Sequence, residues 1–180
     1  MTFVVKFFQI SVQKTKTRLS LRYNNKNFKI MEPRINLFEK GKKAITPIFG
    51  INQYLKHSSI GKQLIELIDF RISQINKCSY CLDMHSKELR AMGETEQRLY
   101  GLSAWRETPY FTERERAALE FAEGVNALHV SDEVYESTKK HFSEEEMIDL
   151  TLVVNSINIW NRFNIVFRQV PGDYQVGMFG

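Results

Sequence analysis

The sequence has few cysteines, unlike small secreted proteins, and lacks the long apolar runs of membrane proteins. Its 180 residues include only two cysteines, Cys78 and Cys81, and no uninterrupted apolar run long enough for a transmembrane helix. Two cysteines in a chain of this length are too few to hold a fold together by disulfides. A Cys-x-x-Cys pair near a histidine is instead typical of reactive thiols in a reducing compartment, so we predict a cytoplasmic location.

Acidic residues are absent from the first 30 positions, which contain seven Lys and Arg residues. The net charge of +4 therefore comes from this segment, because residues 31–180 hold 18 basic and 21 acidic residues. The body of the protein gives no reason to expect a nucleic-acid or membrane partner. Residues 1–30 could be a transit peptide or a basic arm. Alternatively, they are a disordered tail, or sequence upstream of a true start at Met31, which is the interpretation we favour.

Alternating strand patterns of useful length are missing after Met31, and helical periodicity takes their place. Two capping boxes, Thr112–Glu115 and Ser143–Glu146, predict helix starts, and Ser58 or Ser59 is a candidate cap for an earlier helix. We predict an all-α bundle of seven or eight helices. The expected helices are 44–55 with Pro47 in the first turn, 60–76, 78–92, 94–103, 112–125, 131–142 and 143–167, with a loop over 105–111.

The last expected helix is apolar on more than one side. A helix of this kind is buried in the core or between subunits. One small bundle cannot easily cover it, so we predict a homo-oligomer.

One short stretch, Cys78-Ser-Tyr-Cys81-Leu-Asp-Met-His85, contains both cysteines and one of the four histidines. In a helix, residues at these spacings lie within about 60° of one another around the axis, so the three side chains share a face. The two thiols could then form a disulfide, and the His85 imidazole could take the thiol proton to give the nucleophilic thiolate. The helix dipole and the neighbouring Lys77 also favour the thiolate at Cys78.

Other uses of a Cys-x-x-Cys pair fit the sequence less well. A structural zinc site usually needs four ligands; no second cysteine pair is present, and His57, His129 and His141 are not at zinc-finger spacing. Haem attachment needs histidine where Leu82 stands, an iron–sulfur cluster needs more thiolates, and a thioredoxin domain needs flanking strands. We therefore expect no metal and no cofactor. A pair of buried, inert cysteines in a helical core stays open as an alternative.

The segment from Glu66 to His85 resembles the signature of the AhpD-like alkylhydroperoxidases, members of the carboxymuconolactone decarboxylase family. The resemblance rests on a glutamate, two cysteines and a histidine at fixed spacing. It runs from Met31 almost to the C-terminus, with further matching stretches at 93–94, 102–107, 112–123, 142–146 and 158–162. It implies an AhpD-like helical domain over residues 31–180.

The resemblance also implies a thiol-dependent peroxidase that reduces organic hydroperoxides or hydrogen peroxide. By position, Cys81 would attack the peroxide, and Cys78 would resolve the resulting sulfenic acid to a disulfide. His85 would take the proton from Cys81, and Glu66 would complete the proton relay. The implied partners are a peroxide, a dithiol reductant such as a thioredoxin-like or lipoyl protein, and further copies of the chain in a dimer, trimer or hexamer.

Two positions depart from the family pattern. Tyr80 stands where the best-studied peroxidases have histidine, and Lys77 stands where glycine is frequent. Two other functions stay open: a carboxymuconolactone decarboxylase-like enzyme, for which one cysteine would suffice, and a redox sensor or disulfide partner without turnover. The segments Trp105–Glu107 and Trp160–Arg162 either line the site or a subunit contact, or are core aromatics with paired charges.

Overall fold

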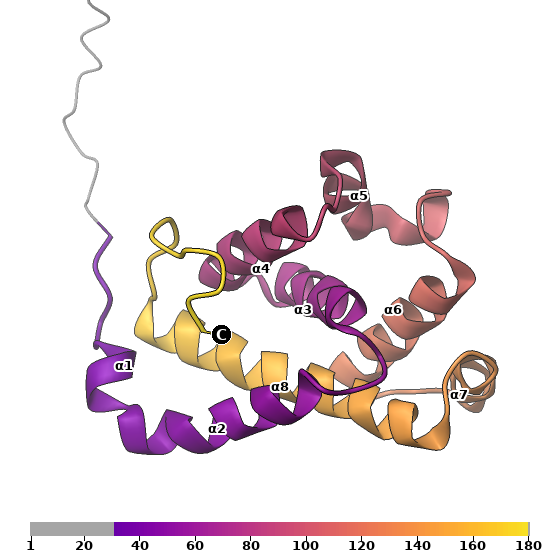
Figure 1. Ribbon diagram of the computed structural model, residues 1–180, viewed down its shortest axis with the longest axis horizontal. Helices are drawn as coiled ribbons and strands as arrows, with labels where there is room; N and C mark the ends of the chain where they lie inside the picture. Colours follow the sequence, from indigo (N-terminus) through magenta and orange to yellow (C-terminus); the bar gives the residue numbers. More distant parts are fainter. Residues whose placement is uncertain (1–30, 180) are drawn as a thin grey trace, which may run out of the picture. The chain divides into compact units, whose positions relative to one another are not determined.

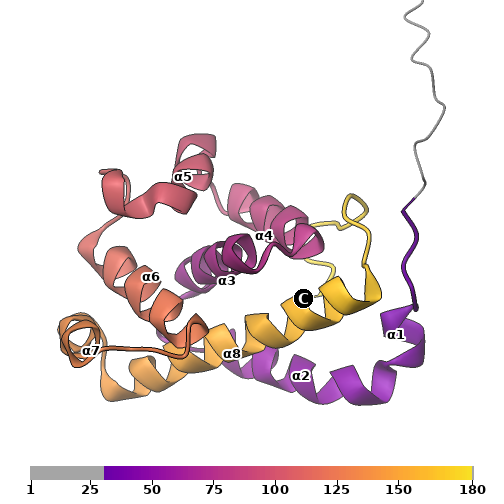
Figure 2. The ribbon, with the colours of Figure 1, turned by 180° about the vertical axis from the view of Figure 1, so that it is seen from behind.

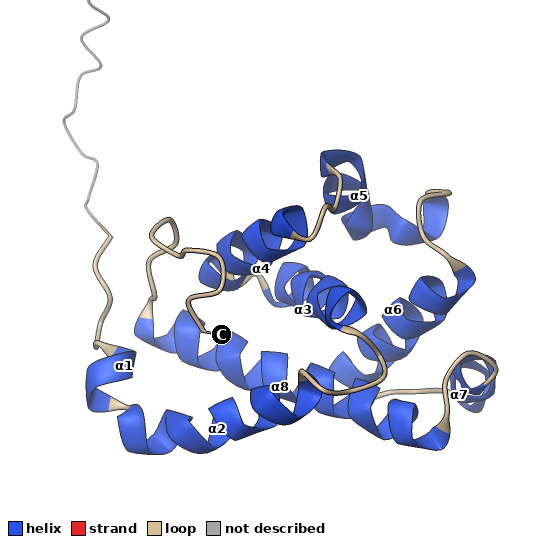
Figure 3. Ribbon diagram, in the orientation of Figure 1, coloured by secondary structure: helices blue, strands red, loops and turns tan. Residues whose placement is uncertain are grey.

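The computed structural model describes residues 31–179, which are mostly helical and contain no β-strand (Figure 1, Figure 2 and Figure 3). This confirms the all-α prediction and its number of helices. The predictions for residues 1–30 lie outside the described residues. The elements are α1 (Leu37–Lys40), α2 (Lys42–Leu55), α3 (Lys62–Asn76), α4 (Ser79–Ala91), α5 (Glu96–Gly101), the 3-10 helix η1 (Leu102–Glu107), α6 (Glu113–Asn126), α7 (Asp132–Lys139) and α8 (Glu144–Phe167).

Both predicted capping boxes form. The Thr112 hydroxyl accepts from the N–H of Glu115, whose carboxylate accepts from the N–H of Thr112. Ser143 and Glu146 make the same reciprocal pair. Each box satisfies two N–H groups that a helix start leaves without a partner, so the sequence alone fixes where α6 and α8 begin.

The start of α2 lies earlier than predicted. The helix begins at Lys42, and Pro47 lies inside it rather than in the first turn. Proline lacks the N–H that would bond the carbonyl of Lys43, so the helix loses one backbone bond. Beside this gap, the Thr46 hydroxyl donates to the carbonyl of Lys42 at 2.7 Å and supports the first turn.

The predicted serine cap of α3 is wrong. The N-cap is Gly61, whose φ of 88° is accessible to glycine without strain, and no side chain caps the helix. Ser58 and Ser59 instead donate to the carboxylates of Asp149 and Glu146, at 2.5 and 3.1 Å. The two serines therefore tie the α2–α3 turn to α8.

The region after Gly93 also differs from the prediction. The expected helix 94–103 ends at Gly101, and η1 continues to Glu107, with Ala104 outside the helical range at φ −123°. Burial of Trp105 against the core holds this turn in place, so the expected loop begins only at Thr108.

Helix α3 is the centre of the packing and contacts α4, α6 and α8 (Figure 1 and Figure 2). Its side chains Leu67, Ile68 and Ile72 are at most 1% exposed, as expected for a helix covered on several sides. A second, smaller cluster joins α1 and α2 to the C-terminal half of α8. Helix α8 therefore belongs to both clusters.

The surface of α8 is only partly covered. Leu150, Val153 and Val154 are fully buried, whereas Ile148 and Val166 are more than half exposed. The predicted homo-oligomer is not tested by a single chain and stays a prediction. None of the helices in residues 31–179 has both the length and the apolar character needed to cross a membrane.

Candidate functional site

A tight turn between α3 and α4 places the first cysteine. Lys77 ends α3 in the left-handed conformation, with φ 59° and ψ 39°, and Cys78 is the extended N-cap of α4. The Cys78 N–H donates to the carbonyl of Ser73, and the Cys78 carbonyl accepts from the N–H of Leu82. The motif helix therefore begins at Ser79, one residue later than predicted.

A disulfide joins Cys78 and Cys81 within the first turn of α4. Their Cα atoms are 5.4 Å apart. Cys78 is 1% exposed and Cys81 is fully buried. The start of α4 also places the positive end of the helix dipole at these sulfurs, which favours a thiolate when the pair is reduced.

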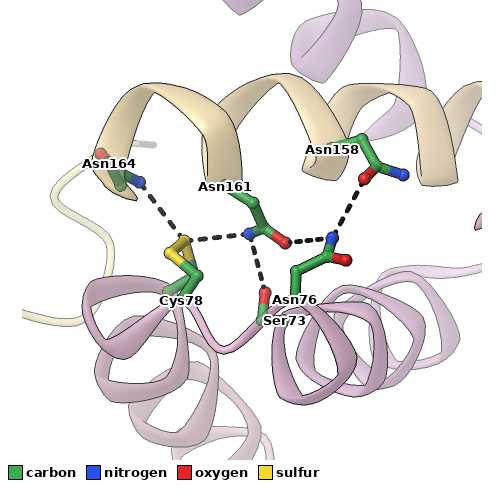
Figure 4. The surroundings of a disulfide bond; sticks show 7 residues. Ser73, Asn76, Cys78, Asn158, Asn161 and Asn164 are labelled. Atoms are coloured by element: carbon green, nitrogen blue, oxygen red, sulfur yellow. Dashed lines mark hydrogen bonds between the residues drawn. A yellow bond between two sulfur atoms is a disulfide. The ribbon is translucent and has the colours of Figure 1, made fainter. Parts of the chain in front are cut away.

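The sulfur of Cys81 accepts two hydrogen bonds from side chains of α8 (Figure 4). The Nδ2 atoms of Asn161 and Asn164 lie 3.1 and 3.3 Å from Sγ, and both side chains are buried. The sequence analysis named Asn161 only as part of an aromatic segment and missed Asn164. The signal that could have found them is an asparagine at every third position, 155, 158, 161 and 164, in the largely apolar second half of a helix.

Glu66 on α3 and His85 on α4 meet across the helix pair, with Oε2 2.7 Å from Nδ1. Burial of the ring lowers the pKa of His85, but the charge and hydrogen bond of Glu66, with help from Asp69 and Glu88, outweigh burial and raise this pKa above its ordinary value. The other ring nitrogen, Nε2, is buried and has no hydrogen-bond partner among residues 31–179. This nitrogen is available to a ligand or to a reacting proton.

Asp69 lies one turn after Glu66 and was not considered in the sequence analysis. Its Oδ1 atom is buried without a partner in the described part of the chain. Burial raises the pKa of Asp69 to about 7; His85 opposes this shift and Glu66 adds to it. The carboxyl group therefore titrates near neutral pH rather than in the acidic range of an exposed aspartate.

The four predicted site residues form two pairs. Glu66 contacts His85, and Cys78 is bonded to Cys81. His85 is one helical turn from Cys81, but within residues 31–179 no hydrogen bond joins its ring to either sulfur. The roles expected for these residues stay predictions.

A pocket of about 140 Å³ lies beside the Glu66–His85 pair. A cavity of roughly this size holds a benzene-sized ring, so the pocket fits a small organic molecule. Neither cysteine lines it. Its apolar lining comes mainly from α2, α3 and α8 and includes Phe49, Leu55, Ile65, Val153, Ile157 and Trp160.

Four buried polar atoms without a partner belong to residues that line this pocket. They are Asp69 Oδ1, His85 Nε2, Trp160 Nε1 and Asn164 Oδ1. In residues 31–179 only one other side-chain atom, Glu94 Oε2, is buried without a partner. Because such groups are usually paired, their gathering at one pocket points to a ligand with a polar head and an apolar body.

The segment after α8 forms part of the pocket wall. The Tyr174 hydroxyl and the Gly177 N–H donate to the Glu88 carboxylate at 2.5 and 2.7 Å. The ring of Phe179 stacks on Phe38 with centroids 5.2 Å apart. Residues more than 80 positions apart in the sequence therefore close this side of the pocket.

The remaining sequence candidates divide between the pocket and the core. Trp160 and Tyr80 line the pocket. Trp105 is a core residue whose Nε1 donates to Glu123 at 2.9 Å. In the described residues, no group of three or more His, Cys, Asp or Glu side chains is arranged to hold a metal ion.

Residues 47–124 match the family described as "Carboxymuconolactone decarboxylase family". The "Uncharacterized protein YdfG" of Bacillus subtilis (strain 168) is 41% identical over 138 residues, which cover 75% of this chain and 94% of that protein. The chain belongs to the carboxymuconolactone decarboxylase family, as the resemblance of the cysteine motif predicted.

Solved structures share the fold. A protein of unknown function from Agrobacterium tumefaciens, provisionally described as the antioxidant defence protein AhpD, is 36% identical with a TM-score of 0.75, over 79% of this chain and 100% of that chain. The debrominase Bmp8, solved in complex with 2,3,4-tribromopyrrole, has a TM-score of 0.68 at 19% identity, over 76% of this chain and 74% of its own, and shares the fold alone. These relations confirm an AhpD-like fold and support an enzyme with a peroxidase-related or decarboxylase-like role.

Proposed function

We propose that the protein is a thiol-dependent peroxidase that reduces organic hydroperoxides or hydrogen peroxide through Cys78 and Cys81. The observation that carries this proposal is the pairing of the two cysteines one helical turn from a buried His–Glu pair. The mainly apolar pocket beside that pair favours an organic hydroperoxide over hydrogen peroxide.

The proposed reaction begins with transfer of the Cys81 proton to His85, whose raised pKa favours the imidazolium. The thiolate attacks the terminal oxygen of the hydroperoxide, so that an S–O bond forms and the O–O bond breaks. The leaving alkoxide takes the proton from His85 and departs as the alcohol, while Cys81 becomes a sulfenic acid. Glu66 holds the ring through Nδ1 and stabilises its positive charge.

Cys78 then attacks the sulfur of the sulfenic acid. The S–S bond forms, the S–O bond breaks, and the hydroxyl leaves as water with the Cys78 proton. A dithiol reductant returns the pair to two thiols and becomes a disulfide itself. A lipoyl or thioredoxin-like protein is the proposed donor.

The burial of both sulfurs favours a second candidate. A reductant cannot touch a disulfide that is at most 1% exposed unless the surrounding side chains move. A redox sensor, which forms this disulfide without catalytic turnover, would fit slow exchange of this kind.

The deciding experiment measures consumption of cumene hydroperoxide with dihydrolipoamide or reduced thioredoxin as donor. The wild type is compared with Cys81→Ser, Cys78→Ser and Ser79→Ala, the last being an exposed neighbour in the same turn. We expect turnover to be lost in both cysteine variants and kept in Ser79→Ala. A dimedone-trapped sulfenic acid at Cys81 in the Cys78→Ser variant would assign the attacking thiol.

Other outcomes would overturn the proposal in different directions. Disulfide formation by the wild type without catalytic consumption would replace the peroxidase with the sensor. Thiols inert to peroxide would leave a decarboxylase-like reaction as the next one to test.

A further inference from the structure

The two sulfurs of the disulfide have different surroundings. Cys81 Sγ accepts hydrogen bonds from the amides of Asn161 and Asn164, whereas Cys78 Sγ accepts none from residues 31–179 (Figure 4). Both cysteines come from the same helical turn and feel the same helix end. The asparagine bonds are therefore what distinguishes them.

The orientation of the Asn161 amide is fixed by its neighbours. Its Oδ1 atom accepts from Asn76 Nδ2 at 2.9 Å, which leaves Nδ2 to face Ser73 Oγ and Cys81 Sγ, both at 3.1 Å. Asn76 in turn donates to Asn158 one turn earlier on α8. Because the oxygen is already engaged on the other side, the amide presents a donor to the sulfur.

Asn164 joins the sulfur to the pocket. Its Nδ2 donates to Cys81, while its Oδ1 is buried without a partner and the residue lines the pocket. An acceptor oxygen at this place can receive the O–H of a hydroperoxide. The same amide would then contact the thiolate and the substrate.

A buried thiolate is costly unless donors replace its water shell, and N–H bonds to a charged sulfur are stronger than bonds to a neutral one. We propose that Asn161 and Asn164 stabilise the thiolate form of Cys81 and so make it, rather than Cys78, the attacking thiol. The stabilisation of the Cys81 thiolate is inferred from the geometry alone. That this thiolate attacks a peroxide rests on the proposed peroxidase function.

The same two bonds give reduction of the disulfide a direction. The thiolate of the dithiol donor attacks Cys78 Sγ, the S–S bond breaks, and its electron pair stays on Cys81 Sγ as a thiolate, to which the two amides donate hydrogen bonds. The donor's second thiol then attacks the mixed disulfide, so that the donor leaves oxidised and Cys78 regains its thiol. Cys81 is thus the attacking group in one half of the cycle and the leaving group in the other.

The test titrates each thiol by its thiolate absorbance at 240 nm, without peroxide. Cys81 is titrated in a Cys78→Ser background, and Cys78 in a Cys81→Ser background. We expect the lower pKa at Cys81. Asn161→Asp keeps the shape and the bond from Asn76 but places an acceptor against the sulfur, and Asn164→Leu removes the second donor; each should raise the Cys81 pKa by about one unit, a tenfold loss of thiolate at neutral pH.

The matched control is Asn158→Asp, which changes the same amide network on α8 without contacting the sulfur. We expect it to leave the Cys81 pKa unchanged, and circular dichroism checks that every variant is folded. If Asn161→Asp does not fold, Asn164→Leu and Asn164→Asp decide. A Cys81 pKa that is the same in all folded variants, or higher than that of Cys78, overturns the inference.

The titration separates this inference from the proposed function. A shifted pKa in a protein that consumes no peroxide would sustain the thiolate assignment and remove the peroxidase. Catalysis that needs both cysteines but is unchanged by substitution of Asn161 and Asn164 would sustain the peroxidase and remove the role of the two asparagines.

Discussion

Asp69 is the side chain with the most unusual environment in the pocket. A carboxylate in a buried position loses its hydration, and only His85 among its close neighbours offsets that loss. Its pKa near 7 compares with an ordinary 3.8, so the folded protein binds this proton more tightly than the unfolded chain does. The contribution of Asp69 to stability is therefore fully present below pH 3.8 and is lost as the pH rises through 7.

Replacing Asp69 with asparagine removes this titration. We expect Asp69→Asn to be more stable than the wild type at pH 8, by at most roughly 4 kcal/mol, because the wild type must bury a charge there. The difference should shrink towards pH 4. Urea unfolding at several pH values measures it, with the exposed Asp173→Asn as control. A difference that does not change with pH would contradict the assignment.

At the scale of elements, the turn between α3 and α4 carries an avoidable strain. Lys77 adopts a left-handed conformation, which costs a residue with a Cβ atom roughly 1–2 kcal/mol and costs glycine little. This explains why glycine suits the position, which the resemblance noted without a reason. The lysine is exposed and supplies no side-chain hydrogen bond within residues 31–179 that would offset the cost.

We therefore expect Lys77→Gly to stabilise the protein by about 1 kcal/mol, the strain relieved less the added freedom of glycine in the unfolded chain. Lys56→Gly is the matched control, because Lys56 ends α2 with an ordinary helical φ of −59°. That change should destabilise the protein. Thermal unfolding of both variants gives the comparison, and equal effects would contradict the strain argument.

The local signals in the sequence account for much of the element structure. The capping boxes at Thr112 and Ser143 involve residues three positions apart, so their hydrogen bonds can be predicted from the local sequence. The errors at Ser58 and Ser59 have a different origin. There the outcome depends on α8, more than 80 residues away, and no local pattern contains that contact.

The whole molecule builds the pocket from segments that only the fold brings together. Its walls come from α1 to α4, α8 and the segment after it, and the closing ring of Phe179 lies on Phe38. Sequence reasoning found Cys78, Cys81 and His85 because they lie within two turns of one helix. It placed Glu66 only through the family resemblance and had no means of placing Asp69 or Asn164, since their roles depend on how α3 and α8 pack.

Substitution of Phe179 tests whether the closed pocket holds the organic part of a substrate. An aromatic contact is worth roughly 0.5–1.5 kcal/mol, so Phe179→Ala should raise the KM for cumene hydroperoxide about two- to tenfold. The KM for hydrogen peroxide, which has no apolar part, should change little. Steady-state kinetics with both peroxides measures this, with the exposed neighbour Met178→Ala as control. Equal changes for both peroxides would mean that Phe179 acts on the fold rather than on the ligand.

The disulfide closes a very small loop, because the bonded cysteines are three positions apart in one helical turn. A cross-link restricts the unfolded chain less as the loop it closes becomes shorter. Oxidation and reduction of this pair therefore change the free energy of unfolding far less than a bond between distant segments would. If the pair cycles as proposed, each exchange of two electrons would leave the fold in place.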